Sequence, residues 1–397
     1  MKPLFTHIFT HRRTCILLAA LLTLTLCGCG TGGTEEETGS DTPPSTAETT
    51  PPAGETGQEQ NDPVQALLES MTVEEKVGQL FFVRCPEENA AEDVAAYHLG
   101  GVLLFGRDFK DRTYGEVRAA TDALQAAAEI PLLIGADEEG GTVVRASSNP
   151  NLRSEKFAAP QTVYAQSGLE GLAADAAEKS SFLLGLGVNV NFAPVADVAA
   201  DSGSFIYGRT LGLDAEGTAE GIGAIVSAMS EAKIGSVLKH FPGYGDNVDT
   251  HTGIALDERP YEDFVNEDFL PFRAGIEAGA GSVLVSHNIV QCMDASLPAS
   301  LSPEVHRVLR EELGFESVIL TDDLAMDALK AYAEDGTVAV LAVMAGNDML
   351  VTTDYRTQIP QVLAAVEDGT VSEETLDNAV VRVLRWKMAL GLLGAQA

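Results

Sequence analysis

The sequence predicts one α/β domain built as a (β/α)8 TIM-type barrel, and two observations carry that prediction. Eight short apolar runs, rich in β-branched residues, alternate with helical patterns between residues 62 and 397, as expected for parallel strands buried on both faces. Polar residues follow the C-terminal ends of these runs, where a barrel brings them to one mouth; they are His240, His287, Asp322, Asp137 and Asp197. A doubly wound open sheet is the alternative, and the count of eight favours the barrel.

The expected strands span residues 80–84, 100–105, 130–135, 188–198, 236–240, 282–286, 318–321 and 348–352. The helices between them are marked by their first residues. Thr72 and Glu75 form a capping-box pattern at one helix start, and Ser302 precedes a proline at another. That second helix is expected to stop at Gly314, since glycine readily adopts the conformation that ends helices. Ser372 opens the last helix, with two acidic residues in its first turn.

Residues 1–29 are predicted to be a lipoprotein signal peptide. Three basic residues lie among the first thirteen, and the apolar run 14–26 that follows is too short to span a membrane. The sequence Leu-Cys-Gly-Cys at 26–29 resembles a bacterial lipobox, with Cys29 as the lipidated residue. An ordinary secretory signal is the alternative. We expect an exported protein, anchored to the outer face of the cytoplasmic membrane as a lipoprotein.

Residues 30–61 are rich in Thr, Glu, Gly and Pro and contain almost no apolar side chains. Such a segment cannot bury a core, so we expect a disordered linker. Residues 62–397 then form the folded domain. It contains two cysteines, Cys85 and Cys292, which make no disulfide framework and are expected to be free.

The chain is strongly acidic, with 25 basic and 59 acidic residues and a formal net charge of -34. This charge argues against nucleic acid or an anionic membrane surface as an electrostatic partner. We interpret it as a contribution to solubility. We expect no nucleic-acid partner and a monomer.

The segment 235–253, GSVLKHFPGYGDNVDTHTG, begins as a buried strand and becomes a loop rich in glycine and charge. Such a loop is typical of a pocket at the C-terminal edge of a strand. Asp249 and His251 are two residues apart, so their side chains can point the same way on an extended loop. The carboxylate can then accept the Nδ1–H of the imidazole and leave Nε2 for proton transfer.

The segment 317–326, SVILTDDLAM, is an apolar strand that ends in two carboxylates. At least one of them should therefore lie at the barrel mouth. Adjacent side chains point in opposite directions from a strand, so Asp322 and Asp323 are not expected to face the mouth together. The alternative is that the pair only caps the following helix.

These two segments resemble a known family. LKHFPGYGDNVDTH is similar to the K-H-F-P-G-H-G…D-[ST]-H signature of the single-domain bacterial exo-β-N-acetylglucosaminidases (β-N-acetylhexosaminidases) of glycoside hydrolase family 3. Thr321-Asp322 is similar to the family's [ST]-D-x-x-M segment, and the resemblance runs from about Met71 to Gly394. It implies a retaining mechanism, with Asp322 as nucleophile and His251, oriented by Asp249, as proton donor.

The resemblance also implies five substrate-binding residues and neither cofactor nor metal. Lys239 and His240 match the family's K-H pair, and Arg209 lies in a G-x-R-[ST]-[FLY]-G motif. Asp137 begins a D-x-E-G-G motif, and His287 belongs to a short polar turn after the sixth expected strand. The alternative for the cations is a structural ion pair at the barrel mouth.

Three positions depart from the family pattern. Tyr244 replaces the second histidine of the signature, Thr142 replaces the arginine that follows E-G-G, and Glu138 replaces a glutamine. The first two bear on the exact substrate, because an arginine in that region could recognise a distal anionic group. The reaction type does not depend on them.

The expected function is removal of terminal β-linked N-acetylglucosamine from peptidoglycan fragments, with chitin oligosaccharides as the second choice. Four alternatives remain at this point. A metal enzyme is disfavoured, because the His and Asp spacing in the loop matches no familiar metal pattern. A sugar-binding lipoprotein, a substrate-assisted hexosaminidase using Asp137 and Glu138, and a β-glucosaminide phosphorylase or other β-glycosidase of the same family are the others.

Overall fold

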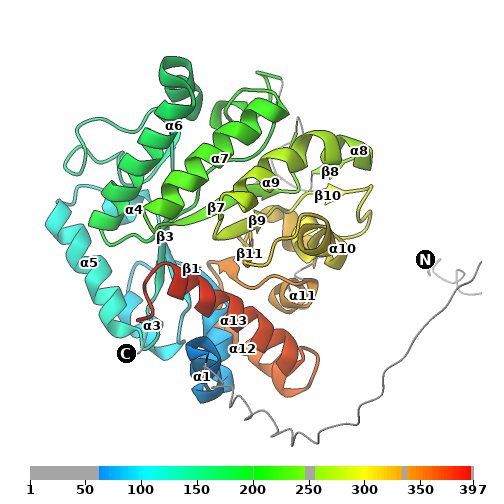
Figure 1. Ribbon diagram of the computed structural model, residues 1–397. Helices are drawn as coiled ribbons and strands as arrows, with labels where there is room; N and C mark the ends of the chain where they lie inside the picture. The colour runs from blue at the N-terminus through cyan, green and yellow to red at the C-terminus, as the bar shows by residue number, and fades with distance from the viewer. Residues whose placement is uncertain (1–61, 200, 246–254, 333–337, 395–397) are drawn as a thin grey trace, which may run out of the picture. The chain divides into compact units, whose positions relative to one another are not determined.

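The computed structural model describes residues 62–199, 201–245, 255–332 and 338–394. Its centre is a sheet of eight parallel strands that follow one another around the barrel in chain order (Figure 1). They are β1 (Phe81–Arg84), β2 (Gly101–Leu104), β3 (Leu133–Ala136), β6 (Val190–Asn191), β7 (Gly235–Phe241), β9 (Ser282–Val285), β11 (Val318–Thr321) and β12 (Leu350–Thr352). All eight expected strands are confirmed, with shifts of a few residues at their ends.

The sheet closes on itself between β11 and β12. Leu320 and Met349 form a parallel bridge, and the backbone N–H of Thr321 donates to the carbonyl oxygen of Met349 at 3.1 Å. On its other side β12 pairs with β1, with Phe81 beside Leu350. A doubly wound sheet would reverse its strand order at one point and keep two open edges. The closed, unreversed order therefore confirms the barrel.

Helices surround the sheet (Figure 1). They are α1 (Pro63–Ser70), α2 (Val73–Gln79), α3 (Ala90–Ala96), α4 (Gly106–Phe109), α5 (Tyr114–Ala127), α6 (Pro160–Gly185), α7 (Ala215–Glu231), α8 (Tyr261–Asp263), α9 (Phe269–Glu277), α10 (Pro303–Arg307), α11 (Val338–Ala345), α12 (Tyr355–Glu367) and α13 (Glu373–Ala389). Two small sheets, β4 (Glu138–Gly140) with β5 (Val143–Val144) and β8 (Leu256–Asp257) with β10 (Ile289–Val290), accompany the barrel. Within the described ranges, no helix is both long and apolar enough to cross a membrane.

The predicted helix starts are confirmed by their capping contacts. The Thr72 hydroxyl accepts from the backbone N–H of Glu75, whose carboxylate accepts from the N–H of Thr72. The hydroxyl groups of Ser302 and Ser372 accept the backbone N–H of Val305 and Thr375 and so cap α10 and α13. Gly314 has a positive φ of 70° after the turn that continues α10. Cys85 and Cys292 are both free, as expected.

The single tryptophan of the chain seals the base of the barrel. Trp386 projects from α13 and is 3% exposed, in a cluster with side chains from the inside of the sheet. A Cβ atom at Gly281 would lie 2.1 Å from its indole nitrogen, and one at Gly235 would lie 2.8 Å from its ring. These two glycines stand at the N-terminal ends of β9 and β7. They are needed there because any side chain would collide with the indole.

Lys387 follows this tryptophan in the sequence, and its burial at the base of the barrel can be tested. Its side chain is fully buried, and its Nζ donates to the side-chain oxygen of Gln79 at 2.6 Å. Burial lowers the pKa of Lys387 from 10.5 to about 7. The folded protein therefore releases a proton that the unfolded chain keeps between these two pH values, so wild-type stability should rise with pH in that window.

We expect the unfolding free energy of the wild type, relative to Lys387→Met, to increase by about 1.4 kcal/mol for each pH unit between 7 and 10. Urea denaturation of both proteins at pH 7, 8 and 9 measures this difference, and ionisations common to both cancel. A constant difference over this range would show that Lys387 is not buried as described.

Candidate active site

A cavity of about 400 Å³ opens at the C-terminal ends of the barrel strands. Its polar lining consists of Arg84, Asp137, Arg145, Arg209, Lys239, His240, Asp322 and Asp323. A larger cavity of about 730 Å³ lies at the other end, around Trp386 and Arg382. The active sites of barrel enzymes lie at the C-terminal ends of the strands, and only the first cavity gathers carboxylates and imidazole at that end. It is the candidate active site.

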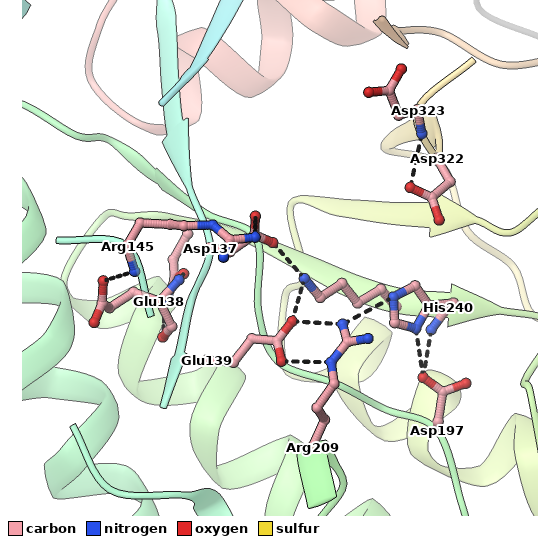
Figure 2. A network of polar contacts seen from close by, with 11 residues as sticks. Asp137, Glu138, Glu139, Arg145, Asp197, Arg209, His240, Asp322 and Asp323 are labelled. Carbon is pink, nitrogen blue, oxygen red and sulfur yellow. Dashed lines mark hydrogen bonds and ion pairs between the residues drawn. The ribbon is translucent and has the colours of Figure 1, made fainter. Parts of the chain in front are cut away.

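Lys239 stands at the centre of an ionic network on one wall of the cavity (Figure 2). Its Nζ lies 2.8 Å from Asp137 Oδ1 and 2.7 Å from Glu139 Oε1, and its side chain is 4% exposed. Burial alone would raise the pKa of Asp137, but Lys239 and Arg145 outweigh it and hold the pKa at about 2. Asp137 is therefore an anion, and hence a hydrogen-bond acceptor, at every physiological pH.

Arg209 and Asp197 hold His240 from two sides. Arg209 binds Glu139 through two nitrogens, at 3.0 and 2.8 Å, and its Nη2 lies 3.3 Å from His240 Nε2. Asp197 Oδ2 accepts from the backbone N–H of His240 at 3.0 Å and lies 2.8 Å from its Nδ1. Because guanidinium only donates and carboxylate only accepts, Nδ1 carries the proton and Nε2 is the acceptor. The network thus fixes both the tautomer and the ring orientation.

Tyr244, which stands where the family signature has histidine, belongs to the support of this network. It is 2% exposed, and its ring centroid lies 4.9 Å from that of His240. Its backbone N–H donates to Asp197 Oδ1 at 2.8 Å, so Asp197 is held at both oxygens. The substitution therefore leaves the His240–Asp197 pair in place.

Arg145 is a residue of the cavity that the sequence analysis missed. It lies 3.2 Å from Asp137 Oδ2, on the oxygen that Lys239 does not bind. The hairpin of β4 and β5 folds back after Gly140 and Gly141, both at positive φ, and so returns Arg145 to the start of the motif. In the sequence, the two adjacent glycines were the signal that the chain turns back here. Although Thr142 replaces the arginine of the family pattern, Arg145 supplies an arginine to the cavity.

Glu138 faces away from the cavity (Figure 2). It is fully buried, and its carboxylate accepts the backbone N–H groups of Arg145 and Ala146 at 3.1 and 2.8 Å, as well as the hydroxyl of Ser147. Burial raises its pKa. Its carboxylate is used to hold the hairpin, which argues against a substrate-assisted mechanism by Asp137 and Glu138 as a pair.

Asp322 and Asp323 turn in opposite directions after β11, as expected (Figure 2). The Asp322 carboxylate points toward the side of the cavity that holds His240, and its Oδ1 accepts the backbone N–H of Asp323 at 2.8 Å. The Asp323 carboxylate accepts the backbone N–H of Ala325 at 3.0 Å, and burial raises its pKa. Of the two, Asp322 turns its carboxylate toward the side of the cavity that holds His240, and Asp323 caps the turn that follows.

His287 was expected to bind substrate, but the structure places it behind this turn. It is fully buried and is absent from the cavity lining. Its Nε2 lies 3.0 Å from the carbonyl oxygen of Asp323 and its Nδ1 lies 2.7 Å from the Ser300 hydroxyl. The carbonyl can only accept, so Nε2–H donates to it. His287 therefore supports the turn that presents Asp322 and, among the described residues, does not line the cavity.

Asp249 and His251 lie outside the described residues, and only the two ends of their segment are placed. Arg259 anchors both ends. It binds Asp257 at 2.8 Å and Asp268 at 2.8 Å, and its Nη2 donates to the carbonyl oxygen of Gly243 at 3.2 Å. Burial, only partly offset by Arg259, raises the pKa of Asp268 to about 7.

One group of side chains in the described part of the chain has the arrangement of metal ligands. Glu75, His98 and Glu129 offer ligand atoms that all lie within 4.8 Å of one another. They precede β1, β2 and β3 in the chain, so they lie at the base of the barrel and not in the candidate active site.

The comparison with protein families gives one match that covers most of the chain. Residues 72–386 match the family described as "Glycosyl hydrolase family 3 N terminal domain". Among curated proteins, the "Beta-hexosaminidase" of Xanthomonas campestris pv. campestris (strain B100) is 36% identical over 234 residues, covering 58% of this chain and 70% of that protein.

Two solved structures extend the comparison to the whole barrel. A glycoside hydrolase family 3 β-N-acetylglucosaminidase from Paenibacillus sp. str. FPU-7 superposes with a TM-score of 0.76 and 31% identity, over 83% of this chain and 64% of that one. This chain therefore spans a little less than two thirds of the Paenibacillus protein. A β-N-acetylhexosaminidase from Beutenbergia cavernae DSM 12333 gives a TM-score of 0.71 and 29% identity, over 80% of this chain and 99% of that one.

Proposed function

Because this chain belongs to glycosyl hydrolase family 3, we propose that it is a retaining exo-β-N-acetylglucosaminidase. It is a glycoside hydrolase, and the names of its relatives favour N-acetylhexosamine as the sugar. The observation that carries the proposal is the position of Asp322, Asp137, Lys239, Arg209 and His240 in one cavity, where Glu139 holds Lys239 and Arg209 from behind.

The strand order explains why this cavity suits removal of a terminal sugar. Asp322 follows β11 and Asp137 follows β3, which are four strands apart in a barrel of eight and therefore face each other. A pyranose with its anomeric carbon at Asp322 directs its far end to Asp137. Lys239, Arg145 and Glu139 close the space around that carboxylate, so a chain that continued beyond the terminal sugar would meet charged side chains.

The proposed reaction is a double displacement. Asp322 attacks the anomeric carbon, the bond from that carbon to the leaving oxygen breaks, and the oxygen takes a proton from the His251 imidazolium. Water then gives a proton to the neutral imidazole and attacks the same carbon, which releases the Asp322 carboxylate and restores the starting protonation. The product sugar keeps the β configuration.

His251→Ala should distinguish substrates by how much their leaving group needs a proton. We expect turnover of an unactivated disaccharide to fall by about 100-fold or more, the contribution typical of a general acid. A dinitrophenyl glycoside leaves as a stable anion and should lose least. Steady-state rates on both substrates check this, and equal losses on both would count against His251 as the donor.

A 2-fluoro sugar with an activated leaving group tests the proposal as a whole. The fluorine slows the second displacement, so a retaining enzyme accumulates a covalent glycosyl-enzyme that mass spectrometry can locate. We expect the label on Asp322. A sugar-binding protein or a substrate-assisted enzyme would give no such adduct. A phosphorylase would give the adduct but would release glycosyl phosphate when phosphate is added to the reaction.

We further propose peptidoglycan fragments with terminal N-acetylglucosamine as the substrate, ahead of chitin oligosaccharides. The N-terminal pattern at 26–29 supports export and lipidation at Cys29 on the outer face of the cytoplasmic membrane. That location would bring the enzyme to the cell wall. We propose that the enzyme acts as a monomer.

A further inference from the structure

The cavity of about 730 Å³ at the base of the barrel takes no part in the proposed reaction. Gly235 and Gly281, at the N-terminal ends of β7 and β9, belong to its lining, so it lies at the end of the barrel opposite the candidate active site. Among the described residues that line it, four carry a positive charge and one, Glu316, a negative charge. The four cations are Lys233, which follows α7, Arg310, which precedes β11, and Arg382 and Arg385 of α13. This excess of cations is opposite in sign to the net charge of the chain, which is -34.

Two guanidinium groups of this cavity share a single carboxylate. Asp348 has a side chain that is 1% exposed, and it binds Arg310 at 2.5 Å and Arg382 at 3.0 Å. Both arginines are themselves half-buried. Two positive charges therefore face one negative charge away from bulk water, and an uncompensated buried charge is unfavourable.

Arg310 is held in a fixed orientation beside this cavity. Its Nη1 donates to the carbonyl oxygens of Phe315 and Ser317 at 2.8 and 2.6 Å, while its Nη2 binds Asp348. Both Phe315 and Ser317 belong to the cavity lining. A guanidinium group fixed in this way loses little conformational freedom when it binds a further acceptor.

Trp386 adds an unpaired hydrogen-bond donor to the wall of the same cavity. Its side chain is 3% exposed and lines the cavity beside Gly281. The indole Nε1–H is buried and has no acceptor in the part of the chain that the structure describes, although a buried indole usually finds one. A buried donor without an acceptor is unfavourable, so an acceptor oxygen brought by a ligand would stabilise this wall.

We propose that the cavity at the base of the barrel is a second ligand site, which binds a small oxyanion with two or more negative charges through Arg310, Arg382 and Lys233. Such an anion supplies the counter-charge that Asp348 alone does not provide. Guanidinium groups bind the oxygens of phosphate and carboxylate through paired hydrogen bonds, and the volume of the cavity is that of small-molecule sites. The site goes beyond the proposed function and does not depend on it.

Trp386 is the only tryptophan of the chain, so its fluorescence reports on this cavity. We titrate the wild type with pyrophosphate, which represents the phosphate class, and with citrate, which represents the carboxylate class. We expect a saturable change in emission, with dissociation constants of about 1 mM or below. Acetate carries one charge and should bind at least about tenfold more weakly. Sodium chloride at the same ionic strength should not reproduce the change.

Isothermal titration calorimetry measures the same binding without relying on the indole. If the two arginines serve only to hold Asp348, neither anion will bind saturably by either method, and the proposal is overturned. Binding of one anion and not the other supports the proposal and identifies the chemical class of the ligand.

Two variants test the residues assigned to the site. Arg382→Gln removes one guanidinium group and leaves Asp348 paired with Arg310; we expect it to weaken anion binding by about tenfold or more. Lys233→Asn removes a charge without straining the backbone, because Lys233 has a φ of 57° and asparagine accepts this conformation. Since Lys233 is exposed, we expect a loss of about threefold. This variant keeps the test valid if Arg382→Gln does not fold, and unchanged affinity in the variants that fold would contradict the assignment.

Two further variants serve as matched controls. Arg118 is exposed on α5 and binds Asp122 at 2.8 Å, so Arg118→Gln should keep the wild-type affinity for both anions. Arg84 lines the active-site cavity at the other end of the barrel, and Arg84→Gln should keep it as well. Loss of binding in Arg84→Gln, with none in Arg382→Gln, would place the anion in the active-site cavity and overturn the proposal.

Discussion

Replacing Asp322 with alanine is expected to reduce turnover of an aryl N-acetylglucosaminide by about four orders of magnitude or more, the size of loss that removal of a nucleophile produces. Asp322 is held in place before substrate arrives, because its N–H donates to the carbonyl oxygen of Val285 at 2.9 Å. His287 supports the same turn from behind. The neighbouring Asp323 is not expected to replace it, because its carboxylate accepts the backbone N–H of Ala325.

Azide adds a stereochemical test to the same variant. In the space left by the Asp322 carboxylate, azide should attack the anomeric carbon of a dinitrophenyl glycoside and give the α-glycosyl azide with partial recovery of turnover. Nuclear magnetic resonance of the product establishes its configuration. Asp323→Asn serves as the control and should lose at most about tenfold, since it acts through the turn and not on the sugar. Rescue of Asp323→Asn in place of Asp322→Ala would reverse the assignment.

Lys239→Met is expected to damage both stability and activity. Two carboxylates, Asp137 and Glu139, would lose a shared cation inside a buried site, which destabilises proteins by about 3–5 kcal/mol. Asp137 would also lose the contact that orients it toward the sugar. We expect kcat/KM to fall by about 1,000-fold, as for the loss of two charge-assisted hydrogen bonds.

The pH dependence of stability separates the loss of the Lys239–Asp137 ion pair from a general loss of packing. The pKa of Asp137 is lowered from 3.8 to about 2 in the folded wild type. Its contribution to stability is therefore complete above pH 4 and is lost as the pH falls toward 2. Denaturant unfolding of the wild type and of Lys239→Met should show that the difference between their unfolding free energies is smaller at pH 3 than at pH 6.

Lys76→Met provides the same chemical change at a pair nearer the surface. Lys76 binds Asp377 at 2.7 Å, but the aspartate side chain is 37% exposed. Such surface pairs contribute about 1 kcal/mol or less. Equal destabilisation by Lys76→Met and Lys239→Met would contradict the central role given to Lys239.

The barrel could be predicted from the sequence because its signals are local and repeated. Each strand is an apolar run, and Thr72, Ser302 and Ser372 mark helix starts through contacts within one turn. Strand ends were less certain, since burial continues past the hydrogen-bonded residues. The expected strand 188–198, for example, pairs as β6 only at Val190–Asn191 and then continues as the segment that holds Asp197.

Residues of the candidate site could be predicted where a single local motif determines their position. Asp137, Arg209, Lys239, His240 and Asp322 all line the cavity, at the barrel mouth where they were expected. Arg145 was missed because the β4–β5 hairpin brings it into the cavity. Arg84 was missed because its position at the cavity depends on the pairing of β1 with β2. The direction of His287 depends on Ser300 and Asp323, which no local pattern relates to it.

The position of Trp386 has a consequence for how the chain reaches its native form. This residue comes after all eight strands in order of synthesis, yet its indole ring occupies the floor between Gly235 and Gly281. The strands made earlier can pair with one another, but their inward side chains have no finished surface to rest on until α13 is in place. The interior of the barrel is therefore complete only when its last helix is in place.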